Sequence, residues 1–348
     1  MKDCILSLAT DLATRLQAID YDSLPISEYN KRYIRSMRPA LEYYLKIYAR
    51  CLQQGIWAAE LPPAALTLID YGGGSGFLSL LAKEAGFGQV IYIDLNPLSA
   101  ATAEVLKQQT AKGPDLILTG DSAELAAYCR SHAIVPQLLI ATDLIEHVYD
   151  LRAFFDEVCT LNRGMHLIFT TASTPFNPFV KSRLHCFMKG CESGKLVSPN
   201  YLSRRREFIR THYPHFTGQQ TEQWSRHTRG LNYAGIRQAI EAGSLPLPAD
   251  KYNTCDPETG NWAERILPIR AYRHLLAAHG YRLSVKTGFY NARRKNPALS
   301  LVCHGLNALI RCSGWGGRLI SPFIVLWCKP SGKEHDHQLG GDHAEKHG

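Results

Sequence analysis

The sequence predicts an α/β fold whose mostly parallel sheet binds a nucleotide. Residues 66–69 form a short run that is apolar except for Thr67, as expected of a strand buried on both faces. A cluster of glycines at 72–76 follows, and glycine lets the chain turn sharply and lets a ligand lie against bare backbone. After a short helical pattern, a second apolar run at 90–93 ends in Asp94, whose carboxylate can accept two hydrogen bonds from the hydroxyls of a ribose.

The spacing of the glycines indicates which nucleotide to expect. The glycines and the acid before them occupy alternate positions: Asp70, Gly72, Gly74 and Gly76. A dinucleotide fingerprint would need a third glycine where Phe77 stands, which disfavours an NAD-binding enzyme. The pattern resembles the first motif of the class I S-adenosylmethionine-dependent methyltransferases. This resemblance implies that the loop passes under the methionine part of the cofactor and that Asp94 holds its ribose.

Later segments follow in the order that this resemblance requires. Residues 115–118 predict a third strand, and Asp121 after it matches the acid that lies beside the adenine in this family. Residues 137–141 predict a fourth strand. The segment at 142–148, Thr-Asp-Leu-Ile-Glu-His-Val, resembles the post-strand motif of methyltransferases of the ubiquinone-biosynthesis type, also called methyltransferase type 11-like. Several motifs in order are much more specific than one glycine loop.

The rest of the chain completes the sheet that the resemblance implies. Periodicity predicts a helix at 151–161, a fifth strand at 165–170, a last helix at 268–279 and closing strands at 281–290 and 323–327. The resemblance implies a Rossmann-like three-layer fold of seven mostly parallel strands in the order 3-2-1-4-5-7-6. Strand seven is expected to be antiparallel.

The chain is expected to have five parts. Apolar residues between 34 and 52 recur on one helical face with Pro39 in its first turn, and two helix-like pieces lie around 201–210 and 233–242. The expected parts are an N-terminal helical cover (1–60), the cofactor-binding Rossmann-like core (61–172), a substrate or lid insert (173–267), the last helix and closing strands (268–330) and a disordered tail (331–348).

The chain has a positive net charge, and its basic residues are concentrated in two segments. The net charge is +8, and residues 181–210 hold eight lysines and arginines against only Glu192 and Glu207. Residues 30–50 are basic as well. Such clusters suit an anionic substrate, a phosphate-bearing surface or nucleic acid, whereas the alternative is a solvated basic face. No nucleic-acid-binding module is recognised, so we expect no nucleic acid partner.

The compartment is read from the N-terminus and the cysteines. The first residues carry acids and only a short apolar run, which predicts no signal peptide. The ten cysteines have no framework spacing and are interpreted as reduced thiols, so a cytoplasmic protein is expected.

One apolar segment has two interpretations. Residues 298–310 form a strongly apolar amphipathic pattern that Arg311, Arg318 and glycines interrupt before it reaches the ~20 residues of a membrane span. Packing into the core is the first interpretation. Contact with a membrane surface is the second, because cationic residues flank the segment.

The motif after the fourth strand contains the candidate catalytic residues. Asp143, Glu146 and His147 resemble the Glu-x-x-Glu-His arrangement by which some ubiquinone-type O-methyltransferases hold a divalent ion beside the acceptor. Asp143 replaces the first Glu and shortens its reach. We therefore commit to no metal and keep these three residues as candidate ligands. Asp143 and His147 are the candidate catalytic residues, His147 for acid–base or positioning work, and Asp143 also supports the cofactor pocket; a purely structural role remains open.

These features together predict an S-adenosylmethionine-dependent methyltransferase. The expected acceptor is a small molecule, a lipid or a glycan, methylated most simply at oxygen. Two alternatives remain: a non-catalytic protein that binds the cofactor or a partner on the same fold, and an NAD-type Rossmann enzyme. A base-modifying nucleic-acid methyltransferase is disfavoured, because its Asn/Asp-Pro-Pro-Tyr/Phe motif is absent from 142–145.

Overall fold

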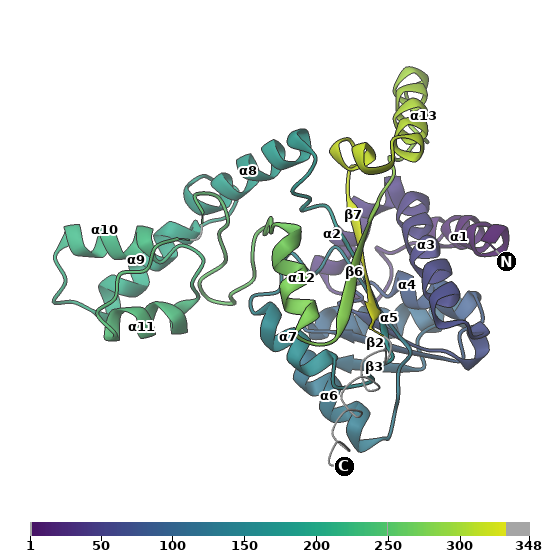
Figure 1. Ribbon diagram of the computed structural model, residues 1–348, viewed down its shortest axis with the longest axis horizontal. Coiled ribbons are helices and arrows are strands. Elements are labelled where there is room, and N and C mark those ends of the chain that lie inside the picture. The colour runs from purple at the N-terminus through teal and green to yellow at the C-terminus, as the bar shows by residue number, and fades with distance from the viewer. Residues whose placement is uncertain (1, 249, 332–348) are drawn as a thin grey trace, which may run out of the picture.

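The computed structural model describes residues 2–248 and 250–331, so all of the tail predicted at 331–348 except Ser331 lies outside the described residues. The described residues form a seven-stranded sheet in the order β3-β2-β1-β4-β5-β7-β6, with helices on both faces (Figure 1). Neighbouring strands are parallel except that β7 runs antiparallel to both β5 and β6. The predicted fold class, strand order and antiparallel seventh strand are therefore confirmed.

The strands lie close to their predicted positions: β1 (Thr67–Tyr71), β2 (Gln89–Asp94), β3 (Leu116–Thr119), β4 (Leu138–Thr142), β5 (His166–Thr171), β6 (Tyr281–Thr287) and β7 (Ile324–Pro330). The largest differences are at the closing hairpin, because β6 ends before 290 and β7 extends beyond 327. After β6 the chain leaves the ladder, since the N–H of Tyr290 donates to the side chain of Asn307 at 2.7 Å instead of to a strand.

Two hydrophobic layers enclose the sheet. One face is covered by α1 (Lys2–Gln17), α3 (Leu41–Ala59), α4 (Phe77–Glu84) and α5 (Pro97–Thr110). The other face is covered by α6 (Ser122–Ser131), α7 (Leu151–Val158) and α12 (Ile269–Ala277). Neighbouring residues of a strand point to opposite faces, so Leu68 packs in the first layer and Ile69 in the second.

The helix predicted through 34–52 is broken. Helix α2 (Glu28–Met37) ends before a 3₁₀ turn at Arg38–Ala40, and α3 begins at Leu41. Pro39 lies in this turn, where its missing N–H and its ring favour a break over a continuous helix. Because the 3₁₀ turn keeps the chain helical, both halves still bury the same apolar stripe, and the periodicity in the sequence hides the break.

The described residues between β5 and α12 form four helices, and not two: α8 (Pro178–Ser193), α9 (Tyr201–His212), α10 (Gly218–His227) and α11 (Tyr233–Glu241). The pieces expected around 201–210 and 233–242 are α9 and α11, whereas α8 and α10 were missed. Polar residues dominate α10, and the apolar residues of α8 are divided between buried positions such as Leu184 and exposed positions such as Phe179. In Figure 1 the four helices extend to the side of the sheet. Phe208, Ile209 and Ile236 form a small hydrophobic core of their own.

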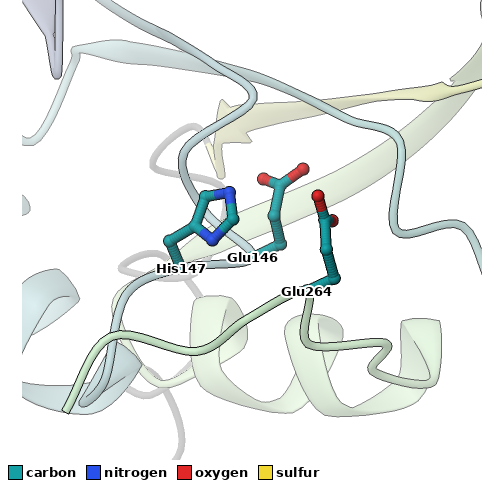
Figure 2. Close-up of side chains that lie close together, drawn as sticks. All are labelled: Glu146, His147 and Glu264. Carbon is teal, nitrogen blue, oxygen red and sulfur yellow. The ribbon is translucent and has the colours of Figure 1, made fainter. Parts of the chain in front are cut away.

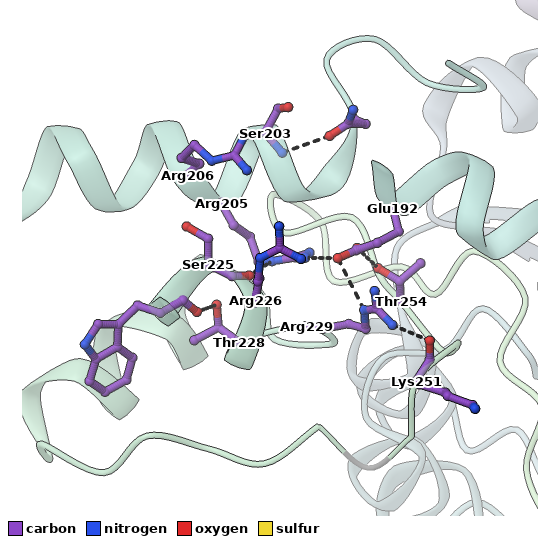
Figure 3. A network of polar contacts seen from close by, with 12 residues as sticks. Glu192, Ser203, Arg205, Arg206, Ser225, Arg226, Thr228, Arg229, Lys251 and Thr254 are labelled. Atoms are coloured by element: carbon purple, nitrogen blue, oxygen red, sulfur yellow. Dashed lines mark hydrogen bonds and ion pairs between the residues drawn. The ribbon is translucent and has the colours of Figure 1, made fainter. Parts of the chain in front are cut away.

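A buried ion pair joins α8 to α9 (Figure 3). Arg205 is fully buried and pairs with Glu192 on α8, and its Nε donates to the carbonyl of Ser225 at 2.9 Å. Glu192 also accepts from the hydroxyl of Thr254 at 2.7 Å and pairs with Arg229 at 3.2 Å. The network therefore ties the insert helices to the segment that leads back to the sheet.

Ion pairs within the fold alter the interpretation of the basic cluster at 181–210 as a surface for an anionic ligand. Four of its arginines have carboxylate partners: Arg204 with Asp256, Arg205 with Glu192, Arg206 with Glu222 and Arg210 with Glu207. Their charge is largely compensated within the fold, so less of it is available to a ligand than the sequence suggests.

The buried pair predicts a stability effect. Burial alone would raise the pKa of Glu192, but Arg205, Thr254 and Arg229 lower it below its ordinary value. Glu192→Gln should lower the free energy of unfolding at pH 7 by about 3–5 kcal/mol, because Arg205 would keep a buried, uncompensated charge. A carboxylate with a lowered pKa stabilises the fold above its unfolded-state pKa, so this difference should shrink as the pH falls below about 4.3.

Glu222→Gln is the matched control, since it removes a half-exposed partner of Arg206 and Arg226 on the same insert. Urea denaturation should show a loss below about 1 kcal/mol for this variant. Equal losses in both variants would contradict the role given to the buried pair.

Candidate active site

A cavity of about 740 Å³ opens at the carboxyl ends of the parallel strands. Open α/β sheets place ligands at this edge, because several strand-to-helix turns meet there. Its lining includes residues at the carboxyl ends of four different strands, namely Gly72, Asp94, Asp121 and His147. Tyr29 of α2 and Asn261, which lies between α11 and α12, line it as well.

The turn from β1 to α4 is held in a shape that only glycine adopts easily. Gly72, Gly74 and Gly76 have positive φ angles of 68°, 54° and 76°. A Cβ on Gly72 would lie 2.5 Å from Leu144, whereas one on Gly74 would meet nothing closer than the ring of Tyr33 at 3.7 Å. The backbone at Gly74 is therefore open to close approach by a ligand.

Asp94 ties this turn to the end of β2. One of its carboxylate oxygens accepts from the N–H of Gly74 at 2.9 Å and the other from the N–H of Asn96 at 2.8 Å. Burial raises the pKa of Asp94 above its ordinary value, although these two N–H groups act in the opposite direction. A carboxylate has about four acceptor sites, so two remain for hydroxyl groups in the cavity.

Asp70 lies behind the glycine turn and does not line the cavity. It is buried and accepts from the N–H of Ser79 at 3.0 Å and from its hydroxyl at 2.6 Å. Burial raises the pKa of Asp70 to about 7, although the bonds from Ser79 act against this. The side chain therefore holds the first turn of α4 against the loop.

Asp121 lines the cavity from the start of α6. Its carboxylate caps the helix by accepting from the N–H of Ala123 at 2.7 Å, and Glu124 completes a capping box. The predicted acid thus lies in the same cavity as Gly72 and Asp94, with part of its hydrogen-bonding capacity used by the helix.

Asp143 lies outside the lining of this cavity, beside the helices that cover the turn. It directly follows β4 with a positive φ of 49°, and its N–H donates to the carbonyl of Thr170 at 3.0 Å. The surrounding protein raises the pKa of Asp143 to about 6, and the Glu264 carboxylate adds to this, while His147 opposes it. Four tyrosines near Asp143 have raised pKa values. Their burial is the main cause, and the negative charge of Asp143 adds to it: Tyr33, Tyr43, Tyr44 and Tyr48.

Glu146 and His147 form a cluster with Glu264, a residue that the motif did not predict (Figure 2). One ligand atom from each residue lies within 4.8 Å of the others. Glu146 is only 1% exposed, and its Oε1 accepts from the hydroxyl of Thr171 at 2.7 Å, whereas its Oε2 has no hydrogen-bond partner among the residues that the structure describes. Burial raises the pKa of Glu146 well above its ordinary value, and the nearby Asp143 adds to this.

A backbone pairing brings Glu264 to the cluster. The N–H of Trp262 donates to the carbonyl of His147 at 3.2 Å, and the N–H of Arg265 donates to the carbonyl of Glu146 at 3.1 Å. Glu264 itself accepts from the hydroxyl of Ser173 at 2.7 Å. The segment that returns from the insert therefore runs alongside the motif after β4.

The ring of His147 is fixed by one hydrogen bond. Its Nδ1 lies 2.8 Å from the carbonyl oxygen of Trp262. A carbonyl only accepts, so Nδ1 must carry the proton, and the neutral ring keeps its lone pair on Nε2. His147 also lines the cavity that contains Asp94.

The donor set fits a divalent cation. Two carboxylates and an imidazole are ordinary ligands for such an ion, and a cation would satisfy the unpartnered Oε2 of Glu146. Among the described residues, this cluster is the group that meets the geometric requirement, and Asp143 is not part of it.

Several lining residues were missed or left out of the predicted site. Tyr29 of α2 was not among the predicted site residues. Thr259, Asn261 and Glu264 carried no signal in the sequence. Their positions depend on the backbone pairing beside His147, which no local pattern reveals.

Comparison with known proteins gives the family. Residues 31–234 match the family model described as a methyltransferase domain. Similar solved structures include magnesium protoporphyrin IX methyltransferase from Synechocystis PCC 6803 with bound SAH, at 15% identity over 83% of this chain and 88% of that chain, with a TM-score of 0.37. A second is a methyltransferase from Mesorhizobium loti, at 15% identity over 79% and 96% with a TM-score of 0.37. A third, from Archaeoglobus fulgidus, has 13% identity over 81% and 92%, with a TM-score of 0.34.

A search of the curated proteins found no match to the chain. The family model nevertheless covers more than half of the sequence. The chain therefore belongs to the methyltransferase-domain family, and its predicted class, an S-adenosylmethionine-dependent methyltransferase, is confirmed.

Proposed function

We propose that the protein transfers the methyl group of S-adenosylmethionine to an oxygen of a small-molecule, lipid or glycan acceptor. The observation that carries this proposal is the position of His147, which lines the cavity of Asp94 and whose bond from Nδ1 to the carbonyl of Trp262 leaves the lone pair on Nε2. An acceptor oxygen needs a group that removes its proton, and this imidazole is placed to do so.

In this proposal the cofactor lies along the glycine turn. Its methionine part approaches the open backbone at Gly74, its ribose hydroxyls donate to the free acceptor sites of Asp94, and its adenine lies beside Asp121. Asp70 is given a positioning role, because it holds α4 and the turn from behind. The acceptor enters from the side of Asp143 and the tyrosines of α2 and α3.

In this reaction the protein mainly has to position the cofactor and the acceptor. When bound, S-adenosylmethionine would supply an electrophilic methyl group, and its transfer to the acceptor oxygen would release S-adenosylhomocysteine. The hydroxyl proton passes to Nε2 of His147, and the carbonyl of Trp262 keeps the ring oriented. Asp143 lies close enough to stabilise the imidazolium that forms.

A second candidate uses the cluster of Glu146, His147 and Glu264 as a metal site. The unpartnered, buried Oε2 of Glu146 favours this candidate. A bound divalent ion would lower the pKa of an acceptor hydroxyl and so replace a general base. The two candidates exclude each other at His147, because Nε2 either holds the ion or accepts the proton.

Asp94→Ala should weaken S-adenosylmethionine binding by about 10- to 100-fold, since hydrogen bonds to a charged group contribute about 1.5–3 kcal/mol each. Titration calorimetry measures this. Asp115→Ala is the matched control, because Asp115 also accepts from a backbone N–H, that of Val90 at 2.7 Å, but at the opposite edge of the sheet. Unchanged binding in Asp94→Ala would remove the proposed ribose site.

His147→Gln should lower kcat by about 100-fold or more while the cofactor Kd stays within a factor of two or so of the parent. His274→Gln on the exposed surface of α12 is the control and should retain full activity. The assay follows release of S-adenosylhomocysteine with candidate hydroxyl acceptors. Full activity of His147→Gln would rule out both candidates for the catalytic group.

Metal analysis separates the two candidates. If the cluster holds an ion, protein reconstituted with manganese should bind about one ion per chain and lose it in Glu264→Gln but not in Glu258→Gln, an exposed residue nearby. Full activity in excess chelator, with no bound metal in the parent, would eliminate the metal candidate and leave His147 as the base.

A further inference from the structure

We propose that α13 (Pro297–Cys312) and the 3₁₀ helix η3 (Gly314–Leu319) dock the protein on a membrane surface that contains anionic lipids. This inference concerns binding alone and does not depend on the chemistry of methyl transfer. Packing into the core, the first interpretation of this segment, is wrong for most of its apolar residues.

The outward face of α13 is apolar and uncovered. Leu301 is 75% exposed and Val302 is 56% exposed, and Trp315 on η3 is 64% exposed. The exposed helix positions on this side carry no charge: Ala298, Leu301, Val302, Gly305, Ala308, Leu309 and Cys312. In Figure 1 the helix stands clear of the sheet. An amphipathic helix with such a face binds in the plane of a membrane interface.

The helix is anchored firmly on its other side. Cys303 and Ile310 are buried, and Asn307 makes two hydrogen bonds to the backbone of Tyr290, one to its N–H at 2.7 Å and one to its carbonyl at 2.9 Å. Gly317 packs against the carbonyl of Ile310 without room for a Cβ. The exposed face is therefore held in place by the fold.

The charge around the helix favours an anionic surface. Residues 265–331 contain eleven lysines and arginines and no aspartate or glutamate. Arg294 and Lys295 lie just before α13, and Arg311 lies in its last turn; all three are exposed and have no carboxylate partner among the described residues. Each cation near such a surface strengthens binding about fivefold.

A cationic pocket lies at the base of α13. Its cavity of about 370 Å³ is lined by Arg50, Arg311 and His304, together with Lys46 and Arg293, which both pair with Glu42. The guanidinium of Arg50 lies 3.7 Å from the centre of the Phe289 ring.

Burial first, and then Arg311, lower the pKa of Arg50. A guanidinium keeps its charge even so, and two like charges brought together favour a counter-anion. When α13 lies on a membrane surface, the phosphate of a lipid headgroup is the anion that can occupy this pocket.

The topology places this surface beside the active site. β6 runs parallel to β1–β5, so its carboxyl end lies at the same edge as the glycine turn, and the antiparallel β7 begins there. α13 and η3 connect these two strand ends. Docking would therefore turn the cavity edge toward the bilayer. Within the part of the chain that the structure covers, no helix is long and apolar enough to cross a membrane.

The test is co-sedimentation of the full chain with phosphatidylcholine vesicles, with and without phosphatidylglycerol. We expect binding to the anionic vesicles that weakens as salt rises. Leu301→Glu with Val302→Glu should weaken this binding by about 100-fold or more. Val135→Glu is the matched control and should bind like the parent, since Val135 is 55% exposed but lies before β4 at the opposite edge.

The charge contribution is tested in the same assay. Arg294→Gln with Arg311→Gln should weaken binding about 25-fold, whereas Arg130→Gln with Arg163→Gln, which removes two exposed cations at the opposite edge, should not. Circular dichroism and cofactor titration confirm that each variant is folded.

Two outcomes would overturn the proposal. One is no binding to anionic vesicles, or binding that both pairs of variants leave unchanged. The other is self-association of the parent that Leu301→Glu abolishes without any vesicle binding, because a second copy of the chain would then cover this face.

Discussion

The carboxylate of Asp94 makes the contacts on which the site depends. By accepting from the N–H groups of Gly74 and Asn96, it joins the turn after β1 to the end of β2 and fixes the backbone along which we propose that the cofactor lies. This is possible because parallel neighbours bring their carboxyl ends to one edge. Tyr92 reinforces the turn, since its hydroxyl donates to the carbonyl of Gly74 at 2.6 Å.

A second constraint is electrostatic. Glu146 and Glu264 lie beside the imidazole of His147, and burial, to which the nearby Asp143 adds, raises the pKa of Glu146 well above its ordinary value. Because the buried Oε2 of Glu146 has no hydrogen-bond partner among the described residues, a proton or a cation there would stabilise the cluster. This supports the role that we propose for the cluster at an acceptor hydroxyl.

The sequence predicted the parts of this fold that are encoded locally. The glycine spacing, the acid at 94 and the apolar strands follow from short-range patterns, and the sheet order follows from a resemblance that these motifs carry. Glu264 could not be predicted, because it reaches the site only through backbone pairing beside His147. The break at Pro39 and the helices α8 and α10 were missed for a related reason: periodicity does not report a short 3₁₀ turn, a largely polar helix such as α10, or a helix such as α8 whose apolar residues are partly exposed.

The exposed helix α13 is a second feature that the sequence pattern did not fully predict. An amphipathic pattern specifies that one face is apolar but not whether the protein covers it, and here the buried stripe is narrow while Leu301 and Val302 remain uncovered. The absence of acids from 265–331 was the additional signal in the sequence. A cofactor cavity and a cationic, apolar surface at one edge of the sheet are compatible with an acceptor that resides at a membrane.

The most direct test of the central claim is a crystal structure of the protein with S-adenosylhomocysteine. The account predicts that the ribose hydroxyls lie within hydrogen-bonding distance of the Asp94 carboxylate, with the ligand backbone against Gly74 and Nε2 of His147 facing the sulfur side of the cavity. Ligand density elsewhere, or a ribose that contacts neither oxygen of Asp94, would contradict it.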